Sequence, residues 1–172
     1  MVKIYDNIIN EFEQEIVKKY LYDESKWSFI QDVSLENNLH QRRPGFKIMF
    51  DDVHPLSSYF ETIINNTAKK IKLKNPELLE ARSFLQLPLN KEYVGEGVDT
   101  PHLDRTEPHL VFLYYVNDSD GPTLLFDDDG NIIESCHPKK GRCIIFPGET
   151  MHSSAEPKHH PSRIVITYNI LL

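Results

Sequence analysis

Apolar residues in the first third of the chain recur at three- and four-residue steps, the spacing that places side chains on one face of a helix. Between residues 6 and 22 this face comprises Ile8, Ile9, Phe12, Ile16, Val17 and Tyr20. Asp6 precedes the stripe and is expected to cap the helix, because its carboxylate can accept a hydrogen bond from the first turn. A second helix is expected to begin at Pro55, a residue favoured in the first helical turn. Its buried face would comprise Leu56, Tyr59, Phe60, Ile63, Ile64, Thr67 and Ile71.

After Pro76 the pattern changes to short β-rich runs separated by turn residues. Strands are expected at 81–87, 110–116, 123–126, 131–134, 142–146 and 163–170, after two earlier ones at 26–30 and 46–50. Asp129-Gly130 indicates a hairpin, since both residues tolerate positive φ. Strands at this spacing are typical of an all-β sandwich or barrel. We expect one α+β domain over residues 1–172, with a helical support region at 1–75 and a β core at 80–172.

The charge and apolar content of the chain indicate which kinds of partner to expect. The 172 residues carry 19 basic and 26 acidic side chains, a net charge of −7. Proteins that bind nucleic acid usually carry a basic excess, so we expect no nucleic-acid partner. No stretch approaches the roughly 20 apolar residues of a membrane span, so no membrane partner is expected. The start of the chain lacks a signal-peptide pattern, and the two cysteines, Cys136 and Cys143, form no CxxC pair. These features favour the cytoplasm.

Candidate chemistry begins with the segment Thr100-Pro101-His102-Leu103-Asp104. Residues i and i+2 of an extended segment project from the same face, so an imidazole and a carboxylate can reach one metal ion. Alone this spacing is a weak signal, since a surface loop can carry a solvated histidine and aspartate.

A second histidine strengthens the metal hypothesis. An apolar strand and a tight turn, 141–148 (GRCIIFPG), are followed by His152, where a rigid scaffold holds the side chain beside a cleft. Two histidines and one carboxylate form the facial triad of non-haem Fe(II) oxygenases, which leaves coordination positions open. Zinc more often recruits a further His or Cys, and the remaining histidines lie in polar or Pro-rich surroundings.

The last expected strand carries an unusual polar face. Arg163, Val165, Thr167 and Asn169 alternate onto one side of it. A guanidinium can grip a carboxylate through two parallel hydrogen bonds, so Arg163 is a candidate anchor for a dicarboxylate that chelates the metal. The alternative is an edge strand whose polar face meets water.

This order of motifs resembles the prolyl-4-hydroxylase-like branch of the Fe(II)/2-oxoglutarate oxygenases over about half the chain, from residue 84 to 170. LVFLYYVN at 110–117, GPTLLF at 121–126 and the Pro-x-x-Gly run at 138–146 resemble conserved family strands, and Arg163 with Thr167 resembles the Arg-x-x-x-Thr of the hypoxia-sensing subgroup. Two positions depart from the pattern. Pro122 stands in place of a second glycine, and Asn169 stands where prolyl hydroxylases often carry an aromatic residue.

The resemblance implies a double-stranded β-helix (jelly-roll or cupin-like) core and a hydroxylase that uses Fe(II), 2-oxoglutarate and O₂, with ascorbate as a candidate reductant. His102, Asp104 and His152 would hold the iron, and Asp104 favours hydroxylation, since halogenating relatives carry Ala or Gly there. The cosubstrate would be held by Arg163, Tyr115 and Thr167, beside a dry wall that includes Leu124. Tyr93, in a loop at 89–101 that could close over the substrate, and Asn169 are candidate substrate contacts.

Three alternatives remain open. The same chemistry could act on a peptide or protein, which the resemblance favours, or on a small molecule such as a free amino acid. A cupin-like metal-binding module would match the glycine-rich run before His152, but its first motif would carry His-x-His rather than His102-x-Asp104. A non-catalytic interaction module would retain the fold alone. The sequence indicates no oligomeric state.

Overall fold

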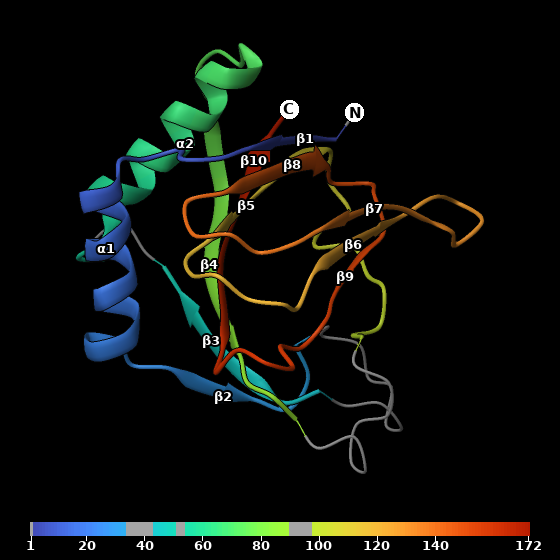
Figure 1. The fold of residues 1–172 in the computed structure, drawn as a ribbon. Coiled ribbons are helices and arrows are strands. Elements are labelled where there is room, and N and C mark those ends of the chain that lie inside the picture. The colour runs from blue at the N-terminus through green and yellow to red at the C-terminus, as the bar shows by residue number, and fades with distance from the viewer. Residues whose placement is uncertain (1, 34–42, 51–53, 90–97) are drawn as a thin grey trace.

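The computed structural model describes residues 2–33, 43–50, 54–89 and 98–172, and these residues form two antiparallel sheets and two α-helices (Figure 1). The larger sheet has the strand order β1-β8-β5-β10-β4-β3-β2, and the smaller sheet has the order β7-β6-β9. The larger sheet contains β1 (Lys3–Tyr5), β2 (Ser28–Ile30), β3 (Gly45–Met49), β4 (Glu77–Gln86), β5 (His109–Tyr115), β8 (Cys143–Pro147) and β10 (Arg163–Leu171). The smaller sheet contains β6 (Thr123–Phe126), β7 (Ile132–Cys136) and β9 (His152–Ser154).

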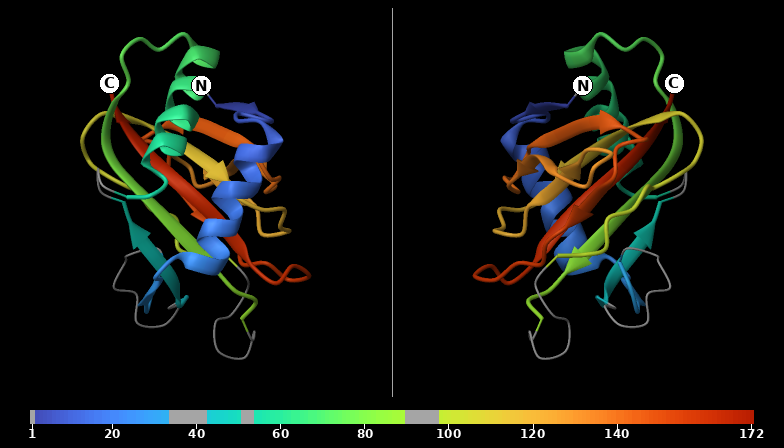
Figure 2. Two further views of the ribbon diagram at one scale, coloured as in Figure 1. Left: turned by 90° about the vertical axis from the view of Figure 1, so that its left-hand side faces the viewer. Right: turned by 90° about the vertical axis from the view of Figure 1, so that its right-hand side faces the viewer.

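The two sheets form the expected double-stranded β-helix, and the helices lie on the outer face of the larger sheet (Figure 2). One apolar cluster fills the space between the helices and this sheet and includes Val17, Ile63 and Ile166. A second cluster, which includes Val111 and Leu125, lies between the two sheets. The larger sheet is therefore buried on both faces, which explains the nearly continuous apolar runs of β5 and β8.

The first helix begins later than its apolar stripe predicts. Helix α1 spans Glu11–Lys19 and is followed by a π-helical turn, η1 (Tyr20–Glu24). The prediction that Asp6 caps this helix was wrong, because Asn10 and Glu13 form a reciprocal capping box that satisfies two backbone N–H groups. The Asp6 carboxylate instead accepts hydrogen bonds from Arg142 Nε at 2.7 Å and Lys139 Nζ at 2.8 Å.

The second helix, α2 (Ser57–Ile71), starts two residues after the predicted Pro55. Its buried face confirms the apolar pattern, with Phe60, Ile63, Ile64 and Thr67 buried. No helix among the described residues has the length and apolar character required to cross a membrane.

The predicted strands are found with shifts of at most two residues at their ends, except that β4 starts four residues before the predicted position, and β6 has the predicted bounds. The 129–130 hairpin is also present, with Gly130 at a φ of 81°. Strands β1 and β9, of three residues each, were not predicted. Since β1, β2 and β3 join the larger sheet, the first 50 residues contribute strands to the core as well as helical support.

Candidate functional site

The connection before β5 and the first residue of β9 bring three candidate metal ligands together at one end of the β-helix. His102 lies in the connection that precedes β5, and His152 is the first residue of β9. The two backbones exchange hydrogen bonds, from His102 N to His152 O at 2.9 Å and from His152 N to His102 O at 3.0 Å. This isolated bridge sets the imidazoles side by side, with ring centroids 4.7 Å apart.

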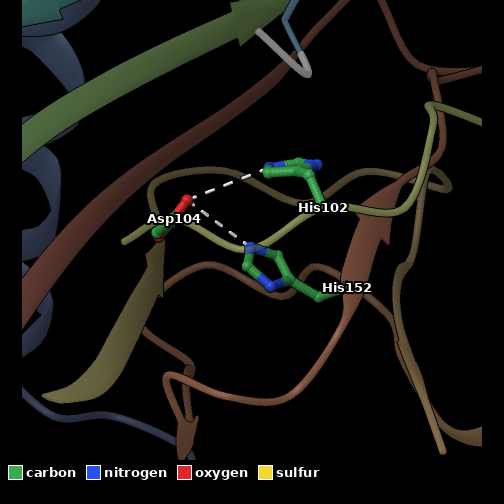
Figure 3. A group of neighbouring side chains, drawn as sticks. All are labelled: His102, Asp104 and His152. Carbon is green, nitrogen blue, oxygen red and sulfur yellow. Dashed lines mark ion pairs between the residues drawn. The ribbon is translucent and has the colours of Figure 1, made fainter. Parts of the chain in front are cut away.

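Asp104 completes the group from the same segment as His102 (Figure 3). Its Oδ1 lies 3.8 Å from His102 Nε2 and 3.6 Å from His152 Nε2. The Nδ1 atom of each imidazole lies near a backbone carbonyl, His102 by Thr100 O at 3.0 Å and His152 by Thr150 O at 3.1 Å. A histidine that donates its Nδ1–H in this way presents an unprotonated Nε2 to a metal.

The charges around Asp104 also fit a cation. Burial raises the pKa of this carboxyl, but His152, Arg82 and His102 outweigh burial and hold the pKa below its ordinary value. Burial and the neighbouring His152 lower the pKa of His102, which favours the neutral imidazole that metals bind. Asp104 Oδ2 is buried and has no hydrogen-bond partner among the described residues. The three residues therefore fit one metal ion, and the Oδ2 atom of Asp104 is not engaged by another side chain among the described residues.

A cavity runs from this triad to Arg163 and is lined by residues of both sheets. The lining comprises Val33, Phe84, Gln86, His102, Asp104, Leu113, Thr123, His152, Ser153, Ser154, Arg163, Val165 and Thr167. Arg163 is the first residue of β10, which lies between β4 and β5 rather than at a sheet edge. The alternative of a solvated polar face was therefore wrong for this strand, and Arg163 is only 2% exposed.

Three hydrogen bonds fix the guanidinium of Arg163. Nε donates to Gly121 O at 2.9 Å, Nη1 to Gln86 Oε1 at 2.8 Å, and Nη2 to Thr123 Oγ1 at 2.7 Å. An arginine side chain has five N–H groups, so these bonds leave two for a ligand. A buried cation with free donors beside a cavity suits an anionic ligand.

Strand register explains how this cavity is built. On the larger sheet, Arg163 pairs with Gln86, Val165 with Phe84, and Thr167 with Arg82. Leu113 of β5 lies opposite Thr167 on the other side. Alternate residues of β4, β10 and β5 therefore form successive rows along the inner face of the sheet. The Arg163 row lies at one end of the cavity, and Arg82 contacts Asp104 at the other.

Of the other residues predicted to contact the cosubstrate, only one lines the cavity. Thr167 lines the cavity, whereas Tyr115 and Leu124 are absent from its lining. Tyr115 is buried behind Arg163, with its ring centroid 5.8 Å from Arg163 Cζ. Its hydroxyl lies 2.8 Å from Thr123 Oγ1, the same atom that binds Arg163. In β6 it is Thr123, the residue before Leu124, that lines the cavity.

The two candidate substrate contacts are not tested by this geometry. Asn169 is 1% exposed and does not line the cavity, and neither of its side-chain polar atoms has a hydrogen-bond partner among the described residues. Tyr93 lies outside the described residues, as does most of the 89–101 loop.

Sequence reasoning missed the polar residues that support the site from β4. Arg82 and Gln86 alternate with Phe84 on the inner face of that strand. The same period-two pattern that singled out β10 is present here, so the signal was available. Their partners could not be read from it, because each lies on a distant segment of the chain.

Comparison with known proteins places this geometry in a class of enzymes. The model of the 2OG-Fe(II) oxygenase superfamily matches residues 90–171, which include the three candidate ligands and Arg163. No match to the chain was found among curated proteins.

Solved structures extend the likeness to the whole fold. A prolyl hydroxylase from Trichoplax adhaerens, in complex with a hypoxia inducible factor peptide fragment, superposes with a TM-score of 0.68 at 16% identity, over 99% of this chain and 83% of that chain. A Pseudomonas putida prolyl-4-hydroxylase gives 0.68 at 14% identity, over 99% and 92%. SnoN, an α-ketoglutarate-dependent epimerase from nogalamycin biosynthesis, gives 0.69 at 12% identity, over 99% and 77%.

The fold and the site thus define a non-haem iron oxygenase. The chain is a 2-oxoglutarate-dependent dioxygenase, and its cofactors are Fe(II), 2-oxoglutarate and O₂. This finding confirms the resemblance seen in the sequence and favours an oxygenase over the cupin-like and non-catalytic alternatives.

Proposed function

We propose that the protein hydroxylates a C–H bond of a peptide or protein in the manner of a prolyl 4-hydroxylase, and that residues 1–172 act as one oxygenase domain. The observation that carries the proposal is a single cavity with a His-Asp-His triad at one end and a buried arginine at the other. Such a cavity can hold a short dicarboxylate between a metal and a cation.

In this proposal His102, Asp104 and His152 hold Fe(II). Bound iron supplies the activation of O₂, coupled to oxidative decarboxylation of 2-oxoglutarate to succinate and CO₂ while one oxygen atom enters the substrate C–H bond. The two unused N–H groups of Arg163 bind the C5 carboxylate, and Thr167, four residues along the same strand face, lines the cavity toward the triad. Tyr115 acts indirectly, because its hydroxyl holds the Thr123 side chain that orients Arg163.

The apolar part of the cavity has a separate role. Phe84, Leu113 and Val165 line the cavity, and Phe84 and Val165 form the row between those of Arg163 and Thr167. They exclude water from the chelated cosubstrate, which strengthens the interaction between Arg163 and the carboxylate.

The cosubstrate site can be tested by anaerobic titration with Fe(II) and 2-oxoglutarate, following the weak visible charge-transfer band of the chelate. We expect the band in the wild type, its loss in Asp104→Ala, and at least tenfold more 2-oxoglutarate to reach it in Arg163→Ala, since truncating one partner of a buried charge pair costs at least about 2 kcal/mol. Asp128→Ala, an exposed change in the β6–β7 turn, serves as the control. Metal binding without a band in the wild type would contradict the assignment.

A peptide substrate is supported by the likeness to prolyl hydroxylases, one of them solved with a peptide. The likeness to SnoN keeps a small-molecule substrate as a second candidate. The iron-loaded enzyme would be incubated with 2-oxoglutarate and either proline-containing peptides or free L-proline and other amino acids. We expect succinate formation to rise with a peptide and the peptide to gain one oxygen atom by mass. Oxidation of free amino acids alone would refute the peptide assignment.

A further inference from the structure

The amide of Gln86 stands between the Arg163 guanidinium and a buried carboxylate. Its Oε1 accepts from Arg163 Nη1 at 2.8 Å, and its Nε2 donates to Asp99 Oδ2 at 2.8 Å and to Ser154 Oγ at 2.9 Å. Gln86 is 4% exposed and Asp99 is 2% exposed. Every polar atom of the amide is thus used within the protein.

Asp99 determines which way this amide points. A carboxylate without a proton can only accept hydrogen bonds, so it binds the NH₂ group of Gln86 and turns the oxygen toward Arg163. The Ser154 hydroxyl donates to the same Asp99 oxygen and accepts from Gln86, which closes a small ring of bonds. In the opposite amide orientation, an NH₂ group would face a guanidinium, two donors in contact.

Asp99 is itself held from the far side. Arg43 Nε lies 3.5 Å from Asp99 Oδ1, and Arg43 Nη1 lies 2.8 Å from Glu156 Oε2. Arg43 and Glu156 are 3% and 4% exposed. A buried charge is tolerated when it is paired. The ion pair between Arg43 and Asp99 therefore allows the Asp99 carboxylate to remain charged beside the cavity. The Asp99 backbone N–H is also bonded, to Ser154 O at 2.8 Å.

We propose that Gln86 is a positioning residue for Arg163 and that Asp99, through the Gln86 amide, sets where the guanidinium stands and hence the length of 2-oxo dicarboxylate that the site accepts. This inference rests on the proposed role of Arg163 as the carboxylate anchor. Gln86 and Asp99 bind no carboxylate of the cosubstrate, so their substitution changes the place of the anchor and leaves its charge intact.

The test uses calorimetric titration of the Mn(II)-loaded protein with 2-oxoglutarate and with its neighbours in chain length, oxaloacetate and 2-oxoadipate. Gln86→Met removes the acceptor and both donors at nearly constant volume. We expect about tenfold weaker binding of 2-oxoglutarate and a smaller preference for it over 2-oxoadipate, in line with the loss typical of residues that orient a ligand-binding group. Gln86→Glu is expected to lose up to about a hundredfold, because its carboxylate would occupy Arg163 itself and repel the ligand.

The chain offers a matched control in Gln14. It lies in α1, is buried to the same degree as Gln86, and its amide donates to Ile9 O at 2.8 Å. It is not among the residues that line the cavity. Gln14→Met is expected to lower the melting temperature and to leave both the 2-oxoglutarate affinity and the preference for chain length unchanged. Equal weakening of binding in Gln14→Met and Gln86→Met would assign the effect to stability and overturn the proposal.

The remaining outcomes separate this inference from the function on which it rests. Wild-type affinity in Arg163→Ala would reject the anchor itself. Lost affinity in Arg163→Ala with wild-type affinity and length preference in both Gln86 variants would overturn the positioning role alone. If neither Gln86 variant folds, Asp99→Asn decides, because an asparagine can offer a donor and allow the Gln86 amide to turn. We then expect a threefold to tenfold loss, and unchanged binding would reject the role of Asp99.

Discussion

A buried carboxyl group lies near each end of the cavity, Asp104 in its lining and Asp99 behind Gln86, and the pKa values of the two groups change in opposite directions. Asp104, at the triad, faces His102, His152 and Arg82, and its pKa is lowered despite burial. Asp99, near Arg163, has a pKa raised by burial to about 6, although Ser154, Arg43, Arg163 and Gln86 lower it in part. Burial alone therefore does not set the charge of an acid in this protein. For Asp104 the hydrogen bond and charge of His152, with the charges of Arg82 and His102, outweigh burial, whereas for Asp99 burial outweighs the effect of its partners.

The two ends also differ in how they are built. The triad combines the irregular segment that carries His102 and Asp104 with the first residue of β9, and a single bridge joins the two. The Arg163 end is formed by the regular strands β4, β6 and β10, and the guanidinium is bonded on three sides. We infer that the triad end suits exchange of metal, O₂ and substrate, whereas the arginine end is a fixed receptor for a carboxylate.

The opposite pKa changes of the two acids give the largest expected effect. The pKa of Asp99 is raised from 3.8 to about 6 in the folded protein, so the folded state binds this proton more tightly than the unfolded state does. Proton binding to Asp99 therefore adds to the free energy of unfolding below pH 4, and this contribution is lost as the pH rises through 6. The free energy of unfolding of wild type, relative to Asp99→Asn, should therefore fall between pH 4 and pH 7. The fall is at most about 3 kcal/mol, because a tenfold change in a proton-binding constant corresponds to about 1.4 kcal/mol.

Urea unfolding of both proteins at four or five pH values measures this difference. Asp128→Asn, in the exposed β6–β7 turn, is the control for the removal of an acidic side chain. A stability difference between wild type and Asp99→Asn that rises with pH would show that Asp99 is ionised at low cost, and the contrast between the two ends would fail.

A second prediction concerns Gly121, whose carbonyl accepts the Arg163 Nε–H. A Cβ atom on this residue would lie 2.2 Å from Ala155 O and 2.9 Å from Glu156 C, both backbone atoms that cannot turn aside. Gly121→Ala should cost about 2 kcal/mol of unfolding free energy, as overpacking does, and should weaken 2-oxoglutarate binding because the carbonyl moves.

Gly130→Ala is the matched control for this substitution. No atom lies within 4 Å of its added Cβ, but its φ of 81° costs about 1 kcal/mol for a residue with a side chain. We expect a modest loss of stability, measured by denaturant unfolding, with unchanged 2-oxoglutarate affinity. Equal affinity in the Gly121 and Gly130 variants would show that the Arg163 end tolerates displacement, contrary to the fixed receptor inferred above.

At both ends of the cavity, the sequence predicted the principal residues but not the residues that support them. The triad was predicted because His102, Asp104 and His152 lie on recognisable local patterns, and Arg163 because its strand carries a polar face. The supporting residues Gln86, Asp99 and Arg82 were not predicted, since their roles depend on contacts with segments up to 77 residues away, as between Gln86 and Arg163. Strand register, which sets those contacts, is fixed by tertiary packing. The Asp6 cap failed for a local reason, because Asn10 and Glu13 offered a better cap closer to the helix.

The smallest expected effect concerns Arg82, which supports the triad from β4 as Gln86 supports Arg163. Its Nη2 contacts Asp104 Oδ1, and its Nη1 lies 2.6 Å from Glu80 Oε1. Arg82→Met removes the group that orients the Asp104 carboxylate, and we expect about tenfold weaker Fe(II) binding, within the range for residues that orient a metal ligand. Arg105→Met is the control, because Arg105 also pairs with Glu80 but is 29% exposed and is not paired with Asp104. Anaerobic Fe(II) titration of both variants measures the effect. Wild-type affinity in Arg82→Met would mean that the bridge between His102 and His152 suffices to place Asp104, and that only the arginine end of the cavity depends on support from β4.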